Sequence, residues 1–401
     1  MAANEKRTGV AFAFDIDGVL LKGPKVLPGA RETIKALQEN NIPFIFLTNN
    51  GGATEEAHIK KLSNLLDLPL TVEQFIQSHS PFKALVPKYG DKTILALGGH
   101  GQQVRQLAHA YGFKNVLISS DIMAGCENLH PFPEMTRAHH EEHGCSPTAQ
   151  GHAQALLTTP IAAILMWTSP RDWCLDLQLI RDLLLSEGGR IGTRSGKNGD
   201  GALPRHGFQQ DGQPALFFSN PDVEWVTPYA FPRLAQGAFR EALKAIWAHD
   251  TDGRAELQYT LYGKPSTTTY EYAEQALLDY HGSMSKEEEE EANSGKEIRT
   301  VYMIGDNPES DIQGANGFQS SRGLEWKSVL CETGVYVAGT EPRHKPTYQA
   351  RNVREAVQLA LREEGINIDI SMDMGELGEE EEEEDVGRNY ADTVASCDSS
   401  D

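Results

Sequence analysis

Two aspartates that stand two positions apart are the first residues in the sequence that could carry chemistry. Asp15 and Asp17 directly follow the apolar run Val10–Phe14, in the sequence VAFAFDIDGVL. Neighbouring carboxylates can act as a nucleophile and a general acid, or they can bind a divalent cation through oxygen. Alone, the pair is also compatible with an acidic turn. A calcium-binding loop is disfavoured, because no acid or amide stands at its fifth position.

A hydroxyl group and a lysine occupy two further positions at the boundaries of predicted strands or helices. Thr48, Asn49 and Asn50 follow the apolar run Phe44–Leu47, and they offer a hydroxyl and two amides that suit a phosphoryl oxygen. Lys264 precedes a predicted helix start marked by proline and serine. A cation beside a helix N-terminus favours anion binding, because free N–H groups and the helix dipole both attract negative charge.

A second acid pair follows the apolar run Val301–Ile304. It consists of Asp306 and Asp311, with Asn307 between them in an Asp-Asn-Pro turn. Each of the four groups alone has an ordinary explanation as a turn, a strand end or a solvated side chain. Their order along the chain, each at the end of a predicted element, indicates one shared site.

The elements that must position these residues alternate between strand and helix. Continuous apolar runs predict strands covered on both faces, and the segments between them have helical periodicity. The predicted strands are Val10–Phe14, Phe44–Leu47, Thr93–Leu97, Val116–Ile118, Ile161–Met166, Ala215–Phe218, Val301–Ile304 and Ser328–Leu330. The predicted helices are Arg31–Gln38, Glu55–Leu66, Gln103–Ala110, Asp176–Leu185, Ala238–Trp247 and Tyr270–Tyr280. This alternation predicts an α/β fold with parallel strands in two sheets, whose carboxyl ends form the ligand crevice.

Composition excludes several classes of function. The chain has 401 residues and a formal net charge of −22, which disfavours binding to nucleic acid or to an anionic membrane. No apolar run is long enough to span a bilayer, and the first residues lack the apolar core of a secretory signal. The five cysteines are scattered and form no CxxC pair. We expect a cytoplasmic protein.

The negative charge is concentrated in two segments. Residues 369–401 carry a net charge of −12, and Ser285–Glu297 carries −4, which leaves −6 for the rest of the chain. We expect the acidic end, 367–401, to be disordered, because it has almost no large apolar residues to bury. The glutamate-rich segment is expected to be a solvated loop.

The four groups together resemble the motifs of the haloacid dehalogenase (HAD) superfamily of hydrolases. The resemblance implies that Asp15 is the nucleophile, which forms an aspartyl-phosphate, and that Asp17 is the general acid and then the base. Thr48 would hold a phosphoryl oxygen, and Lys264 would neutralise charge. Mg²⁺ would be bound by Asp15, by Asp306 and by the backbone carbonyl of Asp17.

The same resemblance implies a reaction class. Asp311 and Asn307 would lie next to the metal ligands without binding the ion. An aspartate at position 17 is typical of phosphoester hydrolysis, so we expect a phosphatase acting on a small phosphorylated metabolite. A phosphomutase is the enzymatic alternative. A non-catalytic binding or regulatory protein on the same scaffold is the alternative from another class.

The spacing of the motifs locates an inserted domain. Only 33 positions separate Asp15 from Thr48, whereas 216 separate Thr48 from Lys264. An insertion there resembles subfamily II, branch IIA, with a C2-type α/β cap. The expected domains are a Rossmann-like core at 8–88 and 258–366 and a cap at 89–257. Asn49, Asn50, Asn220 and Asp222 are the candidate substrate-binding residues. Related caps often form dimers, so a homodimer is left open.

A closer resemblance, to the cat eye syndrome critical region hydrolases of eukaryotes, covers about residues 8–365. It rests on Ser78-His79-Ser80-Pro81, GKPSTTTYEYAE at 263–274, GDNPESDIQGAN at 305–316 and Thr333-Gly334-Val335-Tyr336. Some members of this group are mitochondrial, which gives the alternative to a cytoplasmic location.

For three weaker signals, a structural role is favoured over a functional one. The turn from Leu97 to Gln102 lacks the third glycine of a dinucleotide-binding loop, so it predicts a tight strand–helix turn. His79 is expected to form structural hydrogen bonds. The histidines and cysteines between Cys126 and His152 match no standard zinc-finger spacing, and a polar cap loop is expected there.

Overall fold

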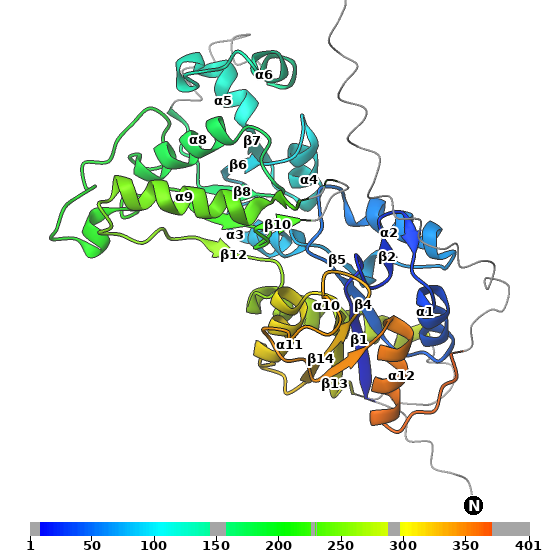
Figure 1. Cartoon of the computed structure of the whole chain (residues 1–401). Coiled ribbons are helices and arrows are strands. Elements are labelled where there is room, and N and C mark those ends of the chain that lie inside the picture. The colour runs from blue at the N-terminus through cyan, green and yellow to red at the C-terminus, as the bar shows by residue number, and fades with distance from the viewer. Residues whose placement is uncertain (1–8, 145–157, 226–228, 230, 288–296, 371–401) are drawn as a thin grey trace, which may run out of the picture.

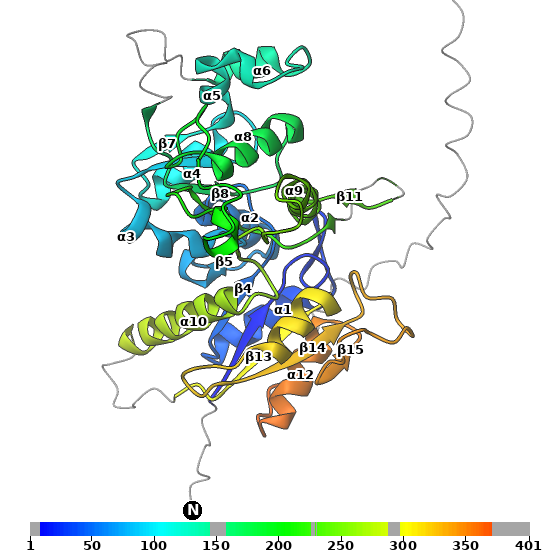
Figure 2. The same cartoon turned by 90° about the vertical axis from the view of Figure 1, so that its left-hand side faces the viewer.

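The computed structural model describes residues 9–144, 158–225, 229, 231–287 and 297–370. Two parallel β-sheets form the centres of two bodies stacked on one another, as Figures 1 and 2 show from two directions. The two ends of the described chain, in blue and in yellow to orange, build one body, and the middle of the chain, in cyan and green, builds the other.

The first sheet has six parallel strands in the order β15-β14-β13-β1-β4-β5. These strands are β1 (Val10–Phe14), β4 (Phe44–Leu47), β5 (Phe75–Ile76), β13 (Thr300–Gly305), β14 (Glu325–Cys331) and β15 (Tyr348–Ala350). All residues of β1, β4 and β13 are buried. Coverage on both faces explains why these segments are continuously apolar rather than alternating.

Helices cover both faces of this sheet. Phe12 and Phe14 of β1 face one helical layer, and Ala11 and Ala13 face the other, as the alternation of side chains along a strand requires. The first layer consists of α1 (Ala30–Glu39), α2 (Glu55–Leu66) and α12 (Val353–Glu363). The second layer consists of α10 (Thr267–Glu287) and α11 (Gln313–Gly317).

The second sheet has five parallel strands in the order β12-β9-β8-β6-β7. These strands are β6 (Thr93–Leu97), β7 (Asn115–Leu117), β8 (Ala163–Met166), β9 (Ala215–Phe218) and β12 (Thr260–Leu261). One face packs on α5 (Ser119–Gly125), α8 (Trp173–Leu185) and α9 (Gln236–Asp250). The other face packs on α3 (Val86–Tyr89) and α4 (Gln103–Tyr111). α6 (Arg137–His143) packs against α5.

Short elements complete the fold. Two antiparallel ribbons pair β2 (Leu21–Lys22) with β3 (Lys25–Val26) and β10 (Glu224–Trp225) with β11 (Arg233–Leu234). Short helical segments lie at η1 (Val72–Gln74), η2 (Ser80–Leu85), η3 (Glu127–Leu129), η5 (Pro204–Gly207) and η6 (Pro308–Ile312).

The expected fold class, an α/β fold with a Rossmann-like core and a second parallel sheet, is confirmed. The expected cap bounds of 89–257 stay a prediction. In the structure β12 still belongs to the second sheet, so the chain returns to the first sheet only after Leu261. The glutamate-rich segment is not entirely a loop, because α10 extends to Glu287. Its residues 288–296 and the acidic end from 371 lie outside the described residues.

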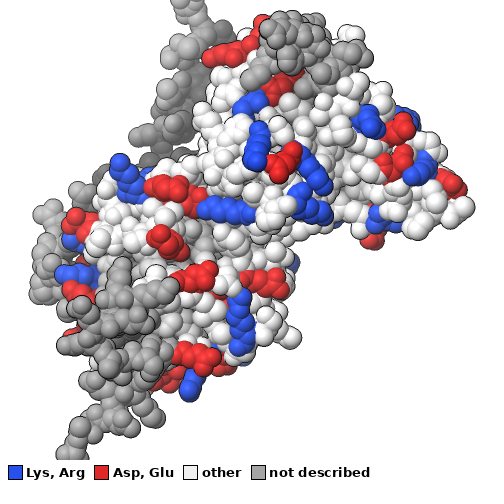
Figure 3. Space-filling view, turned by 180° about the vertical axis from the view of Figure 1, so that it is seen from behind, with Lys and Arg blue, Asp and Glu red and all other residues white. Residues whose placement is uncertain are grey.

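The surface agrees with the charge distribution expected from the sequence. On the face shown in Figure 3, basic and acidic side chains are interspersed rather than gathered in one basic patch. In the described part of the chain, no helix is both long and apolar enough to cross a bilayer.

The topology brings the sequence motifs to one edge of the first sheet. From β1 the chain continues to β4 on one side, and β13 pairs with β1 on the other side. Such a change of direction opens a crevice at the carboxyl ends of the strands. Asp15, Thr48 and Asp306 directly follow these three strands. Lys264 lies in the turn that leads from β12 to α10.

Candidate active site

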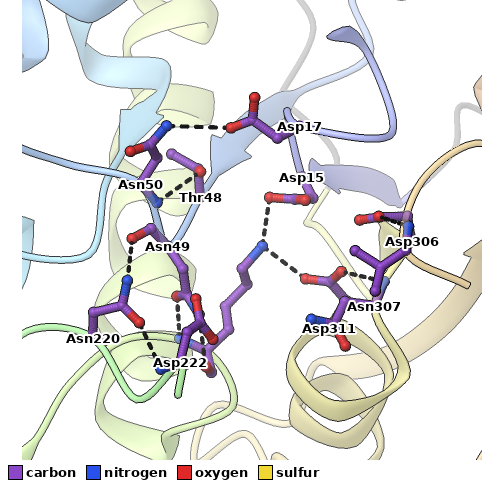
Figure 4. Close-up of polar contacts among 12 residues, drawn as sticks. Asp15, Asp17, Thr48, Asn49, Asn50, Asn220, Asp222, Asp306, Asn307 and Asp311 are labelled. Carbon is purple, nitrogen blue, oxygen red and sulfur yellow. Dashed lines mark hydrogen bonds and ion pairs between the residues drawn. The ribbon is translucent and has the colours of Figure 1, made fainter. Parts of the chain in front are cut away.

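A buried lysine joins two aspartates at the centre of the site. The Nζ atom of Lys264 lies 2.7 Å from Oδ1 of Asp15 and 2.7 Å from Oδ1 of Asp311 (Figure 4). Only 1% of the lysine is exposed. Burial opposes its charge, but the carboxylates of Asp15 and Asp311 outweigh burial and raise the pKa of Lys264. The lysine is therefore a fixed cation beside Asp15.

Three carboxylates crowd around this single cation. Ligand oxygens of Asp15, Asp306 and Asp311 all lie within 4.8 Å of one another, and all three residues are buried. Burial, together with the charges of Asp15 and Asp311, raises the pKa of Asp306 to about 8. Burial also raises the pKa of Asp311 to about 6, although Lys264 opposes this shift. One lysine cannot neutralise three acids, so the cluster has an excess of negative charge.

The surroundings of Asp306 test whether a divalent cation fits this cluster. Val335 donates its backbone N–H to Oδ2 of Asp306 at 2.6 Å, which holds the carboxylate in place. A Cβ atom at Gly18 would lie 2.4 Å from that oxygen, and one at Gly334 would lie 1.9 Å from it. Only glycine allows both turns to enclose Asp306. The donor set contains oxygen alone, and such a set fits Mg²⁺ better than softer metals.

Thr48 and Asp17 lie beside Asp15 at the edge of the sheet. Thr48 is buried, and its hydroxyl accepts the backbone N–H of Asn50 at 3.0 Å. The amide of Asn50 donates to Oδ2 of Asp17 at 3.4 Å. Asp17 is exposed, so a substrate can reach its carboxylate. That carboxylate is not part of the acidic cluster, and the expected role of the Asp17 backbone carbonyl as a metal ligand stays a prediction.

Asn49 holds the backbone of Lys264. Its side-chain oxygen accepts the N–H of Lys264 at 2.7 Å, and its side-chain nitrogen donates to the Lys264 carbonyl at 2.9 Å. The same nitrogen also donates to the carboxylate of Asp222, at 3.2 and 3.3 Å. This double contact fixes the position from which the lysine side chain reaches Asp15.

The two candidate residues of the second body take part in the same network. Asn220 donates its side-chain N–H to the carbonyl of Asn49 at 2.8 Å, and its side-chain oxygen accepts the N–H of Asp222 at 2.7 Å. Both residues follow β9, so they connect the end of the second sheet to the site (Figure 4). Their contact with a substrate stays a prediction.

Asn307 and a glycine position Asp311. The backbone N–H of Asn307 donates to Oδ2 of Asp311 at 3.0 Å, while the Asn307 side chain accepts the N–H of Glu309 at 2.9 Å. A Cβ atom at Gly305 would lie 2.2 Å from the Asp311 side chain, so glycine is required for this close approach. Asn307 therefore supports the turn that carries Asp311.

A buried chain of hydrogen bonds supports the loop that follows Thr48. Nε2 of His79 accepts the backbone N–H of Gly52 at 3.3 Å, so the proton of the ring is on Nδ1, which contacts the hydroxyl of Tyr111 at 2.8 Å. Tyr111 in turn donates to Oε1 of Glu55 at 2.5 Å. Burial lowers the pKa of His79 to about 4. Because Tyr111 ends α4 and Glu55 begins α2, the chain of bonds joins the two bodies.

The turn after β14 was recognised in the sequence as a motif but was assigned no role in the site. Thr333 donates its hydroxyl to the carbonyl of Gly18 at 2.5 Å, and Val335 contacts Asp306. The Thr-Gly-Val sequence after a predicted strand was the available signal, but it contains no charged group. The arrangement as a whole places a buried carboxylate beside a fixed cation and an acidic cluster suited to a divalent ion. It can accept an electrophile that carries negative charge, such as a phosphoryl group.

Two family models match two separate parts of the chain. A model described as haloacid dehalogenase-like hydrolase matches residues 12–114, and a HAD-hydrolase-like model matches residues 261–356. The first match contains Asp15, Asp17 and Thr48, and the second contains Lys264 and Asp306.

Two yeast proteins are similar over most of the chain. A mitochondrial hydrolase of Saccharomyces cerevisiae is 35% identical over 88% of this chain and 95% of its own length. A cardiolipin synthase (CMP-forming)/mitochondrial hydrolase fusion protein of Schizosaccharomyces pombe is 37% identical over 92% of this chain. The chain spans only 56% of that fusion protein.

Solved structures have the same fold. A hypothetical protein from Pyrococcus horikoshii superposes with a TM-score of 0.56 at 21% identity, covering 88% of this chain and 99% of the other. A 4-nitrophenylphosphatase from Thermotoga maritima superposes with a TM-score of 0.51 at 17% identity, covering 88% and 97%. At these identities the two superpositions show that the fold is shared. From the motifs, the yeast relatives and the fold, this chain belongs to the haloacid dehalogenase-like hydrolases.

Proposed function

We propose that this protein is a Mg²⁺-dependent phosphatase that hydrolyses a small phosphomonoester through an aspartyl-phosphate intermediate. One observation carries the proposal. The carboxylate of Asp15 is held against the buried cation of Lys264, inside an acidic cluster whose excess of negative charge a divalent cation would neutralise. A nucleophilic carboxylate needs such compensation, because its target is itself an anion.

The first half of the reaction transfers the phosphoryl group to the enzyme. A carboxylate oxygen of Asp15 attacks phosphorus, and the bond from phosphorus to the leaving oxygen breaks. Asp17 gives its proton to that oxygen, so an alcohol leaves and Asp15 carries the phosphoryl group. Thr48 binds a phosphoryl oxygen, and Lys264 neutralises the negative charge of the phosphoryl group. The exposed position of Asp17 beside Asp15 supports its role as the acid.

The second half regenerates the enzyme. Asp17, now a carboxylate, takes a proton from a water molecule, whose oxygen attacks phosphorus. The bond between phosphorus and Asp15 breaks, which releases inorganic phosphate and restores the Asp15 carboxylate. Burial of Asp15 keeps other nucleophiles away from this intermediate.

Asp15, Asp306 and the backbone carbonyl of Asp17 would hold Mg²⁺. When bound, the ion neutralises the acidic cluster and polarises the phosphoryl group. Asp311 also supports the proposal, because its ion pair with Lys264 keeps that cation directed at Asp15.

The test compares Mg²⁺-dependent release of phosphate from 4-nitrophenyl phosphate by the wild type, Asp15→Asn and Asp252→Asn. Asp252 is exposed, has a positive φ that asparagine tolerates, and pairs with Arg254 rather than with a residue of the site, so it is a matched control. We expect activity in the wild type and the control and none in Asp15→Asn. Equal activity in all three proteins would exclude Asp15 as the nucleophile.

The substrate is proposed only as a class, a small phosphorylated metabolite. A panel of such metabolites would identify it, and net phosphate release distinguishes a phosphatase from the phosphomutase alternative, which would need a bisphosphate. A wild-type protein inactive across the panel and on 4-nitrophenyl phosphate would favour the non-catalytic alternative.

Of the two locations expected from the sequence, we propose the mitochondrial one, because two similar yeast proteins are named as mitochondrial hydrolases. Subcellular fractionation with a tagged full-length protein tests it against the cytoplasmic alternative. Light scattering after gel filtration tests whether the protein is a homodimer.

A further inference from the structure

Three histidines from two separate parts of the second body lie close together. His100 lies in the turn between β6 and α4, while His139 and His143 lie on α6. One ligand nitrogen from each of the three rings lies within 4.8 Å of the other two. The ring centroids of His139 and His143 are 4.6 Å apart, and that of His100 is 4.8 Å and 5.6 Å from theirs.

The spacing on α6 places two of these rings on one face. Residues four positions apart lie above one another on a helix, so His139 and His143 present their rings side by side. Within the described residues, no hydrogen bond satisfies the ring nitrogens of His100 or His139. In the same described part of the chain, the one carboxylate paired with the His143 ring is that of Glu142, whose Oε2 lies 3.9 Å from Nε2. The lone pairs of this cluster are therefore available to a ligand.

The orientation of α6 is fixed by a different histidine. His140 is buried, and its Nδ1 contacts the hydroxyl of Ser120 at 2.9 Å while its Nε2 contacts Asp172 at 3.4 Å. His130 contacts the same carboxylate at 3.1 Å. These contacts turn His140 into the body, which leaves His139 and His143 to face the turn that carries His100.

The turn is shaped to meet α6. Gln102 donates its side-chain N–H to the carbonyl of His143 at 2.5 Å. Gly101 has a φ of +55°, and a Cβ atom there would lie 3.1 Å from the ring of His143. A larger residue would be both strained and crowded, so glycine permits the close approach of the turn to the ring.

We propose that His100, His139 and His143 form a Zn²⁺ site in the second body, separate from the acidic cluster. Three imidazole nitrogens are a recurrent zinc donor set, and they leave a fourth position open. Zn–N bonds of about 2.0–2.1 Å require the rings to move inward by roughly 1 Å, which side-chain rotation of partly exposed residues supplies. The two sites differ in donor type, because this one offers nitrogen and the other offers only oxygen.

The fourth position has room for water. A hollow of about 190 Å³ adjoins the cluster, and His100, His139 and Arg171 are among its lining residues. Bound zinc would connect α6 to the β6–α4 turn. That turn contacts the loop after Thr48, because Gln103 donates its side-chain N–H to the carbonyl of Gly52. Cys145 and His152, which the sequence grouped with these histidines, lie outside the described residues.

The experiment titrates the full-length protein with Zn²⁺ in a large excess of Mg²⁺, which occupies the acidic cluster. A competing chelator dye reports binding to the wild type, His139→Ala/His143→Ala and His249→Ala. His249 is exposed near the end of α9 and serves as the control. We expect one Zn²⁺ per chain in the wild type and the control. Binding to the double variant should be at least about 100-fold weaker, since losing even a group that only orients a ligand costs 10–100-fold.

A second variant and a spectrum keep the test decisive. His100→Asn changes an exposed side chain and should fold even if the double variant does not. Co²⁺ bound to the wild type should give the strong visible bands of low-coordinate cobalt with nitrogen ligands, and His100→Asn should lose them. Equal Zn²⁺ affinity in the wild type and His100→Asn would overturn the proposal. So would a wild type that binds no Zn²⁺ in excess Mg²⁺.

Discussion

Mild acid should destabilise the protein through His79. The ring of His79 is fully buried and lies between the Gly52 backbone, Tyr111 and Trp167. Its Nε2 atom accepts a hydrogen bond, so a second proton would replace that bond with a clash between two donors. Burial lowers its pKa from 6.5 to about 4, with Glu55 opposing the shift and His58 and Lys83 adding to it.

The sign and the size of the effect follow from this shift. Between pH 6.5 and 4 the unfolded chain binds a proton at His79 that the folded chain does not, so stability falls as the pH falls. A pKa lowered from 6.5 to about 4 corresponds to a total of about 3 kcal/mol. Between pH 7 and pH 5, the free energy of unfolding should decrease by about 2 kcal/mol because of this one group.

Urea unfolding, followed by circular dichroism and tryptophan fluorescence, measures the decrease in the wild type, His79→Gln and His249→Gln. His79→Gln should be less stable at pH 7, because it loses the contact with Tyr111. Its stability should nevertheless change by about 2 kcal/mol less between pH 7 and 5 than that of the wild type. The His249 control should follow the wild type. Equal pH dependence in all three proteins would refute the assigned state of His79.

Three further variants probe the site. Without Mg²⁺, Lys264→Met should lower the free energy of unfolding by about 3–5 kcal/mol, because it leaves buried carboxylates uncompensated. If urea unfolding shows a decrease of less than about 1 kcal/mol, the ion pairs with Asp15 and Asp311 are contradicted. Asn49→Ala should lower kcat by about 100-fold with a smaller change in KM, because it releases the backbone that aims Lys264; an effect on KM alone would instead assign Asn49 to substrate binding. Gly334→Ala should abolish the rise in Tm that Mg²⁺ gives the wild type, because a Cβ would lie 1.9 Å from Asp306; an unchanged rise would place the metal elsewhere.

The strands of both sheets were the most predictable part of the fold. Parallel strands buried on both faces are continuously apolar, so β1, β4, β6 and β9 were predicted with the bounds they have in the structure. The helix α6 was not predicted. It has seven residues, and its buried face consists of a histidine rather than of apolar residues at helical spacing.

The residues of the core motifs were predictable because charged groups at strand ends stand out in a sequence. In the structure Asp15, Thr48 and Asp306 directly follow neighbouring strands, and Lys264 contacts Asp15. Their catalytic roles stay predictions. What could not be predicted is how these residues are held. The hydrogen bond between the Asn49 side chain and the Lys264 backbone joins positions 215 residues apart. Nothing in the local sequence of either segment indicates this contact.

The histidine cluster could not be predicted from the sequence either. Counted along the sequence, the stretch from Cys126 to His152 matched no zinc spacing, since its third partner, His100, lies almost forty positions before His139. Only the packing of α6 against the β6–α4 turn brings the three rings together.

The most direct test of the central claim is a search for the phosphoryl group on Asp15. In Asp17→Asn the base for the second step is missing, while 4-nitrophenolate leaves without the help of an acid. Mixing this variant with 4-nitrophenyl phosphate and Mg²⁺ should give a burst of 4-nitrophenolate equal to the enzyme concentration. Mass spectrometry should then find one added phosphoryl group, within the peptide that contains Asp15. Steady turnover without a burst, or a phosphoryl group that persists in Asp15→Asn/Asp17→Asn, would contradict the account.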